Sequence, residues 1–317
     1  MTQQSDDSGA RIAVLGAGFI GMSLVRRLLR DGYSVSVLDH KPPPHDIAGR
    51  VSWVRGDFAD QSAVAAALEK SACAIHLVSS TVPGDEHVDA TRELSDNIFA
   101  TLEFLKTCER VRVPRVVFSS SSSVYGLQEH MPIPESAITD PISSHGIQKL
   151  AIEKYLLLHR FNSGLDVRIA RLSNPYGPGQ RIEGRQGFVA ITIGHLLKNE
   201  RILMRDDGRP VRDFIYIDDV VDAFKRLAIL PRAPTVVNVG LGTGHSLRQV
   251  VDLIAGLIGH PVDAEVGAPR RSDIPVSVLD VGLAAREIGF APTVPMHAGL
   301  ARTLRHHGIA VMENTGV

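Results

Sequence analysis

A histidine and a lysine stand four residues apart near the middle of the chain, in the segment SSHGIQKL (143–150). Residues four apart on a helix share one face, so the imidazole of His145 and the ammonium of Lys149 would be neighbours. An imidazole has an ordinary pKa near ~6.5, and an adjacent positive charge favours its neutral, proton-accepting form. The pair is therefore a candidate acid–base centre. The alternative is a half-buried histidine that packs at, or caps, the start of a helix.

The segment Gly16-Ala17-Gly18-Phe19-Ile20-Gly21 is a second chemical motif. It follows an apolar run and opens a segment of helical spacing, the context in which G-x-G-x-x-G binds the diphosphate of a dinucleotide. The glycines let the backbone approach the diphosphate, and free N–H groups at the helix start stabilise its charge. The motif therefore predicts a bound dinucleotide.

Asp39 stands at the end of the next apolar segment, at the distance from the glycines that this motif requires. Its carboxylate would accept hydrogen bonds from the adenosine ribose and would repel a 2′-phosphate. The sequence therefore favours NAD over NADP. The alternative is that Asp39 is only a turn residue at the end of a strand.

Apolar segments alternate with segments of helical spacing along the first half of the chain. The apolar segments are 11–18, 34–40, 72–80, 115–126 and 165–173, with a later one at 235–240, and the clearest helical segments are 91–110 and 145–161. This alternation is typical of a parallel sheet covered on both faces. We therefore predict an α/β fold with a Rossmann-type doubly wound parallel sheet.

The expected domain organisation follows from the same pattern. Residues 1–10 are polar and are predicted to form a disordered tail, and residues 11–174 are predicted to form the dinucleotide-binding domain. Residues 175–317 would mainly form a smaller C-terminal lobe. Segments at 211–240 would return from this lobe to the main domain.

Composition and charge exclude several classes of protein. The 317 residues are 44% hydrophobic and 22% charged, as in a globular protein, and the net charge of −1 argues against nucleic-acid binding. The N-terminal residues lack the apolar core of a secretory signal, and no apolar run reaches the ~18 residues of a membrane span. Cys73 and Cys108 lie in apolar segments without metal-ligand spacing, so we expect reduced, buried thiols and no metal. The chain is therefore expected to be cytoplasmic, without a nucleic acid or a membrane as its partner.

The whole chain resembles a family, the extended short-chain dehydrogenase/reductases, and within it the NAD-dependent sugar-nucleotide epimerase/dehydratase group, in particular UDP-glucose 4-epimerases. The resemblance covers residues 11–305 and depends on the motifs GAGFIG (16–21), GDFAD (56–60), IHLVSS (75–80), SSSSSVYG (119–126), HGIQK (145–149), NPYGPGQ (174–180), RDFIYIDDVV (212–221), NVGLGTGHSL (238–247) and PRRSDIPVSVLD (269–280). Two positions depart from the group's pattern. Leu15 replaces the first glycine of its usual motif, and His145 replaces its catalytic tyrosine.

The resemblance implies which residues bind NAD. Asp57 and Phe58 would contact the adenine, the segment 77–79 would pass under the cofactor, and Lys149 would bind the nicotinamide ribose. Asn97 would also bind the cofactor. The alternative is that it lies on the surface of a helix. The complete implied set is Gly16, Gly18, Phe19, Ile20, Gly21, Asp39, His40, Asp57, Phe58, Leu77, Val78, Ser79, Asn97 and Lys149.

The resemblance also implies a catalytic set of Ser121, His145 and Lys149. Ser121 takes the place of the serine or threonine that hydrogen-bonds the sugar hydroxyl to be oxidised. Taken alone, the serine run to which it belongs is a polar exit from a strand. The C-terminal lobe would bind the substrate, a nucleotide-diphosphate sugar.

Four residues are implied in substrate binding. Ser123 and Asn174 would contact the nucleotide sugar, and Arg212 and Arg270 would hold its diphosphate with their guanidinium forks. The alternative for Arg212 is a surface ion pair with Asp213.

The residues after Ser121 narrow the reaction. Dehydratases of this group carry an Asp–Glu pair there, to protonate the departing water and to remove a proton, whereas this chain has Ser122 and Ser123. A reductase would more often use NADPH, which Asp39 disfavours. We therefore expect an epimerase that acts at C4 of a UDP- or other nucleotide-diphosphate hexose through a transient ketone. A ketoreductase or dehydratase of the group is the alternative, as is a non-catalytic protein that binds NAD or a nucleotide sugar.

The resemblance finally implies a homodimer. Its interface would be formed by the two long helices expected at residues 91–110 and 145–161.

Overall fold

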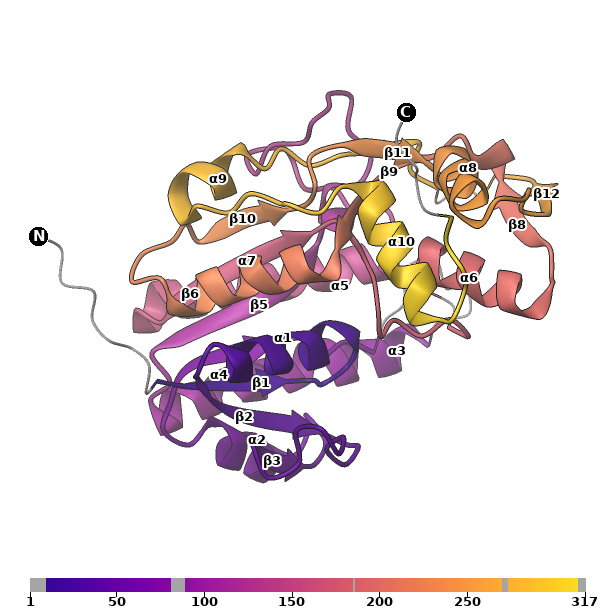
Figure 1. The fold of residues 1–317 in the computed structure, drawn as a ribbon. Helices are drawn as coiled ribbons and strands as arrows, with labels where there is room; N and C mark the ends of the chain where they lie inside the picture. The colour runs from indigo at the N-terminus through magenta and orange to yellow at the C-terminus, as the bar shows by residue number, and fades with distance from the viewer. Residues whose placement is uncertain (1–9, 81–88, 185, 270–272, 313–317) are drawn as a thin grey trace, which may run out of the picture.

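A computed structural model describes residues 10–80, 89–184, 186–269 and 273–312. The predicted tail at 1–10 lies outside this part of the chain except for Ala10. The main body is a seven-stranded parallel sheet in the order β10-β6-β5-β4-β1-β2-β3 (Figure 1), which confirms the predicted doubly wound α/β fold. Its strands are β1 (Arg11–Leu15), β2 (Ser34–Asp39), β3 (Ser52–Arg55), β4 (Ser71–His76), β5 (Arg115–Ser121), β6 (Asp166–Leu172) and β10 (Val236–Val239).

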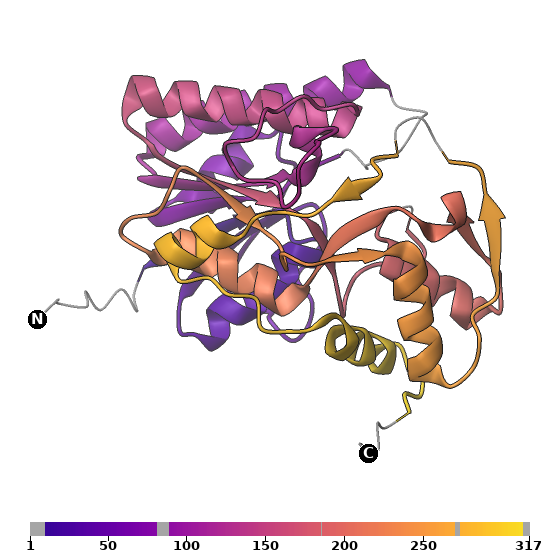
Figure 2. The same ribbon diagram turned by 90° about the horizontal axis from the view of Figure 1, so that it is seen from above.

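Each face of the sheet carries an apolar layer, because successive strand residues point to opposite faces. Within β1, Ile12 and Val14 belong to one buried cluster, and Ala13 and Leu15 belong to the other. Helices α1 (Phe19–Arg30) and α7 (Ile217–Ile229) cover the first face; α2 (Gln61–Leu68), α4 (Ala100–Val111) and α5 (Ser144–Ser163) cover the second (Figure 2). Burial on both faces explains why these strands are continuously apolar in the sequence.

The helical pattern predicted at 91–110 is interrupted by a wider turn. The chain passes through α3 (Ala90–Glu93) and a π-helical segment, η1 (Leu94–Phe99), before α4 begins. A π-helical turn re-aims the side chains within it and is frequent at functional sites. Here it contains Asn97, one of the residues expected at the cofactor site.

Within the described residues, the C-terminal lobe contains two small sheets and three helices. One sheet joins β7 (Asn174–Tyr176), β9 (Val211–Tyr216), β11 (Gly244–Ser246) and β13 (Val276–Ser277), and the other pairs β8 (Ile202–Arg205) with β12 (Ala264–Gly267). The chain leaves this lobe after β9 to form α7 and β10 on the main sheet, and then returns to it. The helices of the lobe are α6 (Phe188–Lys198), α8 (Leu247–Ile258) and α10 (Met296–His306), and the short α9 (Gly282–Ile288) packs near β10.

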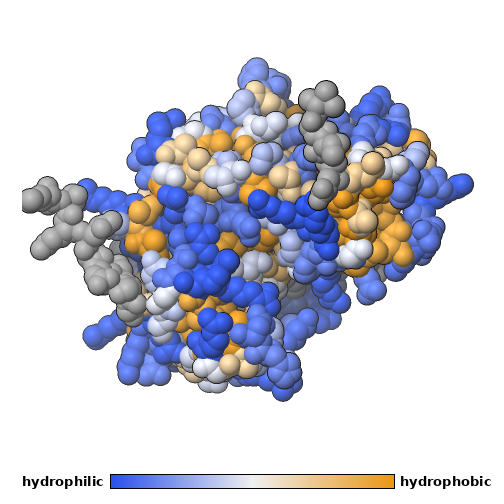
Figure 3. Space-filling view, viewed as in Figure 1, coloured by the Kyte–Doolittle hydropathy of each residue, from blue (hydrophilic) through white to orange (hydrophobic). Residues whose placement is uncertain are grey.

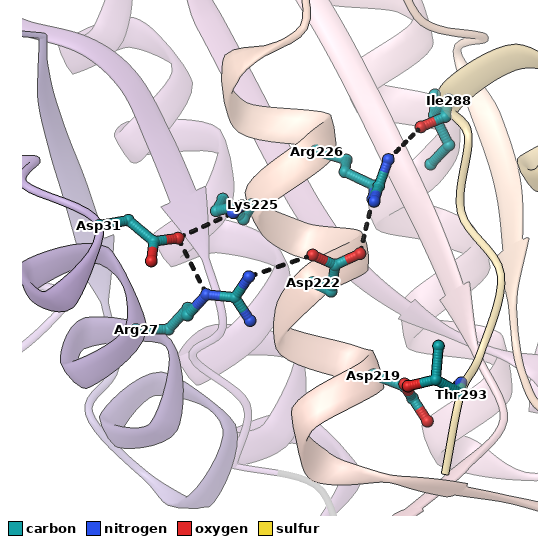
Figure 4. Close-up of polar contacts among 8 residues, drawn as sticks. All are labelled: Arg27, Asp31, Asp219, Asp222, Lys225, Arg226, Ile288 and Thr293. Atoms are coloured by element: carbon teal, nitrogen blue, oxygen red, sulfur yellow. Dashed lines mark hydrogen bonds and ion pairs between the residues drawn. The ribbon is translucent and has the colours of Figure 1, made fainter. Parts of the chain in front are cut away.

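Charged side chains link α1 to α7, the two helices that cover the first face of the sheet (Figure 4). Asp31, just after α1, accepts hydrogen bonds from Arg27 at 2.9 Å and from Lys225 of α7 at 2.8 Å. Arg27 also reaches Asp222, which pairs with Arg226 at 2.5 Å. These ion pairs are half-exposed, and exposed ion pairs contribute little to stability. The apolar contact between the two helices therefore contributes most of the free energy that holds them together.

The surface of the molecule is mainly polar on the face that carries α1 and α7, while an apolar area lies over the lobe near α6 and α8 (Figure 3). Across the described ranges, none of the helices combines the length and the apolar character needed to cross a bilayer. The two cysteines, Cys73 and Cys108, are unpaired and fully buried, in agreement with the sequence.

Candidate functional site

The glycine motif forms a tight turn between β1 and α1. Gly16 has φ +94°, a left-handed conformation that favours glycine. A Cβ at Gly21 would lie 2.0 Å from the carbonyl oxygen of Gly16, so only glycine allows α1 to start this close to the turn. Leu15, the departure from the usual motif, is buried in the core, and the turn forms without a glycine there.

The N-terminus of α1 offers free donors to an anion. Its N-cap residue, Gly18, provides no side-chain cap, and no acidic residue lies in its first turn, which includes Phe19, Ile20 and Gly21. The first N–H groups of a helix have no partner within it and carry a partial positive charge. The turn therefore fits the diphosphate of NAD.

Asp39 links the glycine turn to the end of β2. One carboxylate oxygen accepts the N–H of Ala17 and the other accepts the N–H of Lys41, both at 2.8 Å. Asp39 thus is a turn residue, as the alternative suggested, and it also lies beside the glycine turn, where a ribose would be held. Each oxygen keeps a second lone pair for a ribose hydroxyl. The neighbouring His40 is largely exposed, with its Nδ1 atom 3.5 Å from Asp39.

Asp57 and Phe58 lie in the loop after β3. Asp57 accepts the N–H of Ala59 at 2.8 Å, which forms a local turn. The Phe58 ring is buried against the ring of His76, with centroids 4.6 Å apart. The Phe58 side chain is therefore part of the core, and an adenine could meet only the backbone here.

The exit of β4 passes directly under the glycine turn. The N–H of Leu77 donates to the carbonyl of Leu15 at 2.9 Å, and Val78 lies 3.2 Å from where a Cβ of Gly16 would be. The segment Leu77, Val78 and Ser79 is therefore adjacent to the proposed diphosphate site.

Asn97 lies inside the protein with an exposed fraction of 5%, so the surface alternative was wrong. Its Oδ1 accepts the N–H of Ser80 at 2.9 Å, and the two hydrogens of its Nδ2 are shared among Ser80 Oγ, Gln148 Oε1 and the carbonyl of Glu93, each at 2.9 Å. The amide of Asn97 is therefore committed to the protein, where it holds the segment after β4 in place.

The first two turns of α5 carry two residues of the expected catalytic set, His145 and Lys149, and pack against the turn that begins at the third, Ser121. A Cβ at Gly146 would lie 2.6 Å from the carbonyl oxygen of Ser123, so glycine lets α5 pack directly on the 3₁₀ turn η2 (Ser122–Tyr125). Ser121 opens this turn, and its Oγ accepts the N–H of Ser123 at 3.1 Å and the Ser123 hydroxyl at 2.9 Å. His145 precedes Gly146, and Lys149 lies one turn further along, donating to the carbonyl of Ser119 at 2.8 Å.

Burial sets the protonation of the pair on α5. Burial, together with the smaller effect of the positive charge of Lys149, lowers the pKa of His145 to about 3. Burial also lowers the pKa of Lys149 to about 8, although the carboxylate of Glu153 opposes this shift. At neutral pH, His145 is therefore a neutral imidazole beside a protonated lysine. The helix is capped by Ser143, which accepts the N–H of Gly146, so His145 does not cap it. His145 is buried, so the alternative that it only packs at the helix start stays open.

None of the five tyrosines, all of which lie within the described ranges, replaces the missing phenol. Tyr125 is fully buried and donates to Asn238 at 2.7 Å, and Tyr176 is buried and donates to the carbonyl of Met296 at 3.3 Å. The other three are Tyr33 before β2, the exposed Tyr155 on α5 and the buried Tyr216 at the end of β9.

Arg212 and Asp213 point to opposite sides of β9, so they do not form the surface ion pair suggested as an alternative. Asp213 is fully buried and accepts the N–H groups of Leu241 at 2.7 Å and Gly242 at 3.1 Å. Arg212 is half-buried, and burial lowers the pKa of its guanidinium, opposed by the charge of Asp273. A half-buried guanidinium can bind a diphosphate.

Asn174 lies opposite Phe214, two residues after Arg212, in the small sheet. It opens β7, which pairs in parallel with β9, and its Nδ2 donates to the carbonyl of Asp213 at 3.0 Å. Arg270 lies outside the described residues.

A buried ion pair was missed by the sequence reasoning. Glu153 of α5 accepts Arg171 of β6 at 2.8 Å and the hydroxyl of Ser120 at 2.5 Å. Two features of the sequence could have indicated this ion pair. Arg171 is a charged residue within the apolar segment 165–173, and Glu153 follows Lys149 by four residues. Buried charges must be paired.

Comparison with known proteins identifies the family. A model of the NAD dependent epimerase/dehydratase family matches residues 12–240. The UDP-glucose 4-epimerase of Mycolicibacterium smegmatis is 33% identical over 307 residues, with 93% of this chain and 97% of that protein covered, and a dTDP-glucose 4,6-dehydratase of Streptomyces griseus is 30% identical over 308 residues, with 91% and 90% covered. The structure of UDP-glucose 4-epimerase with UDP-glucose from Thermotoga maritima has a TM-score of 0.88 at 30% identity, over 94% of this chain and 98% of that one. The chain therefore belongs to the NAD-dependent epimerase/dehydratase family, whose cofactor is NAD.

Proposed function

We propose that the protein is an epimerase that inverts C4 of a UDP- or other nucleotide-diphosphate hexose. The observation that carries this proposal is the start of α5, where a neutral, buried imidazole lies beside a charged lysine and Gly146 packs on the carbonyl of Ser123, in the turn that begins at Ser121. This is the set of groups that oxidation of a sugar hydroxyl and return of the proton require. Relatives named as UDP-glucose 4-epimerases support the choice of reaction.

Each side chain has one task in this reaction. His145 accepts the proton of the sugar hydroxyl, and Ser121 holds that hydroxyl by a hydrogen bond while Ser123 donates to Ser121. NAD bound at the glycine turn would supply the hydride acceptor for the sugar carbon and, once reduced, the hydride donor for the ketone. Lys149 holds a positive charge next to His145, which keeps the imidazole neutral until it takes the proton. The protonated His145 would then return its proton to the sugar oxygen when hydride is added to the opposite face of the ketone.

The histidine must act over a shorter reach than a tyrosine. Its ring nitrogen extends about 2 Å less far from the backbone than a phenol oxygen, enough to interrupt a proton transfer unless one water bridges the gap or the sugar sits deeper. We propose that His145 acts directly or through such a water.

The serines at 122 and 123 support epimerisation over dehydration. Ser123 is engaged with Ser121, and neither hydroxyl can supply an acid–base pair at neutral pH. The dehydratase relatives share the fold, but fold alone does not decide the chemistry.

We further propose a cytoplasmic homodimer. Large apolar side chains are exposed on η1, just before α4, and along α5, including Phe99 at 62%, Leu158 at 52% and Phe161 at 87%. Exposed apolar side chains that gather on one helical face are typical of a protein interface. The cytoplasmic location is supported by the two buried thiols, Cys73 and Cys108, which remain unpaired.

Asp39→Ala should narrow the preference for NAD over NADP, because the carboxylate no longer repels a 2′-phosphate. Calorimetry measures the dissociation constants of NAD and NADP. Their ratio is compared, because loss of the hydrogen bond to Ala17 will weaken the binding of both cofactors. Equal affinity of the unaltered protein for NAD and NADP would contradict the assignment of Asp39.

Arg212→Ala should weaken binding of a nucleoside diphosphate by about 2–5 kcal/mol, the typical cost of removing one partner of a buried charge pair. Calorimetry measures the affinity, and circular dichroism checks the fold. Arg209→Ala is the matched control, because Arg209 is exposed and pairs with Asp206 away from the proposed diphosphate. If Arg212→Ala binds as tightly as the parent, Arg212 has only a structural role.

His145→Ala and His145→Phe should lower turnover by about 10²-fold or more. In the parent, kcat/KM should stay level as pH falls from 7 to 6, because His145 with a pKa of about 3 remains neutral. It should fall as pH rises through 8, because Lys149 then loses its proton. His145→Tyr tests whether a phenol at this position can resume the proton transfer. Turnover of His145→Ala at the parent rate would show that another group carries the proton.

Phe161→Asp should convert the dimer into a monomer, because a carboxylate would have to be buried in the interface. Light scattering coupled to size-exclusion chromatography gives the mass. Ile138→Asp is the control, since Ile138 is 80% exposed and lies in a loop that is part of neither α4 nor α5. A monomeric parent would refute this part of the proposal.

A further inference from the structure

A chain of hydrogen bonds connects the segment after β4 with the first turn of α5. Asn97 binds Ser80 through both amide atoms and donates to Gln148 Oε1 at 2.9 Å. Gln148 in turn donates to the Glu93 carboxylate at 2.6 Å and to Ser144 Oγ at 2.9 Å, and Ser144 donates to the same Glu93 oxygen at 2.8 Å. The chain of bonds therefore runs from the segment after β4 to Ser144 and Gln148 of α5, which flank His145 in the sequence.

The first turn of α5 is thus held from two directions. On one side, Gly146 packs on the carbonyl of Ser123, which fixes the distance to the turn that carries Ser121. On the other side, Gln148 binds Glu93 and Asn97 of the helical segment before α4. Both fixed points lie within three residues of His145.

We propose that Gln148 is a positioning residue, whose amide holds the first turn of α5 so that His145 can reach the sugar hydroxyl. The proposal depends on the function proposed for His145. Since an imidazole reaches less far than a phenol, a small shift of the backbone cannot be absorbed by the side chain. A misplacement of about 1 Å can lower the rate of a proton transfer by about 10²-fold.

The arrangement requires an amide at position 148. The Nε2 atom of Gln148 donates to Glu93 and Ser144, while its Oε1 atom accepts from Asn97. A glutamate at this position could still accept from Asn97 but could not donate, and its carboxylate would face that of Glu93 at hydrogen-bond distance. Like charges so close repel each other and would push the helix start away from its partner.

A swap of the two groups provides the decisive comparison. In Gln148→Glu the repulsion is present, whereas in the double variant Glu93→Gln/Gln148→Glu the amide at 93 donates to the carboxylate at 148. Asn97 and Ser144 can donate to that carboxylate in both variants. The double variant therefore restores the contact with the donor and the acceptor exchanged, at the same net charge as the parent.

The experiment measures kcat and KM of the parent, Gln148→Ala, Gln148→Glu and the double variant on the nucleotide sugar that the parent accepts. We expect kcat to fall by about 10²-fold in both single variants with KM nearly unchanged, and to recover in the double variant. Lys154→Ala, an exposed position on the same helix, is the control and should match the parent. Thermal unfolding midpoints show whether each variant is folded at the assay temperature.

A second readout does not depend on turnover. The imidazole resonances of His145, assigned by their loss in His145→Phe, should shift in Gln148→Ala and Gln148→Glu and return to the parent position in the double variant. If the parent turns over no nucleotide sugar, the function proposed for His145 fails, while these resonances still decide whether Gln148 positions it. Folded single variants with parent-like kcat and unshifted His145 resonances would overturn the proposal. So would a folded double variant that recovers neither property.

Discussion

A buried ion pair between Glu153 and Arg171 holds together the elements that carry the candidate site. Glu153 is 1% exposed and receives two nitrogens of the Arg171 guanidinium as well as the hydroxyl of Ser120. Arg171 also lies over the ring of Tyr125, 4.8 Å from its centroid. One buried carboxylate thus joins α5, the ends of β5 and β6, and the turn that begins at Ser121. Removing either charge would leave the other unpaired in the core, which is strongly destabilising.

The carboxylate of Glu153 also affects the protonation of Lys149 and, through it, of His145. Glu153 opposes the loss of charge that burial imposes on Lys149, and the charge of Lys149 in turn favours neutral His145. The protonation of the two residues on the first turns of α5 is therefore linked to an ion pair one turn below them. In this way the fold and the acid–base properties of the site depend on one set of contacts.

A histidine in the place of the family's tyrosine changes what the protein must provide. A phenol has an ordinary pKa near ~10 and must be made more acidic before it can act as a base, whereas an imidazole is already neutral at pH 7. In the proposed reaction, the lysine would therefore be needed less for lowering a pKa and more for holding the cofactor and stabilising the charge. The requirement on geometry becomes stricter, because the shorter side chain leaves less freedom in the position of α5.

The sequence alone determined the α/β class, the parallel sheet and its order of alternating elements, because apolar periodicity and the glycine turn are local properties of the chain. The sequence also determined that the cofactor is NAD, because the glycine motif and Asp39 form a local structure at neighbouring strand ends. It placed Ser121, His145 and Lys149 in one site only by resemblance, since nothing local brings a strand exit to a helix start. The tertiary structure decided their surroundings: that Phe58 is in the core, that Asn97 and Asp213 are buried within hydrogen-bond networks, and that Glu153, Arg171 and Gln148 support α5. These roles depend on desolvation and on contacts between residues far apart in the chain, which no spacing in the sequence specifies.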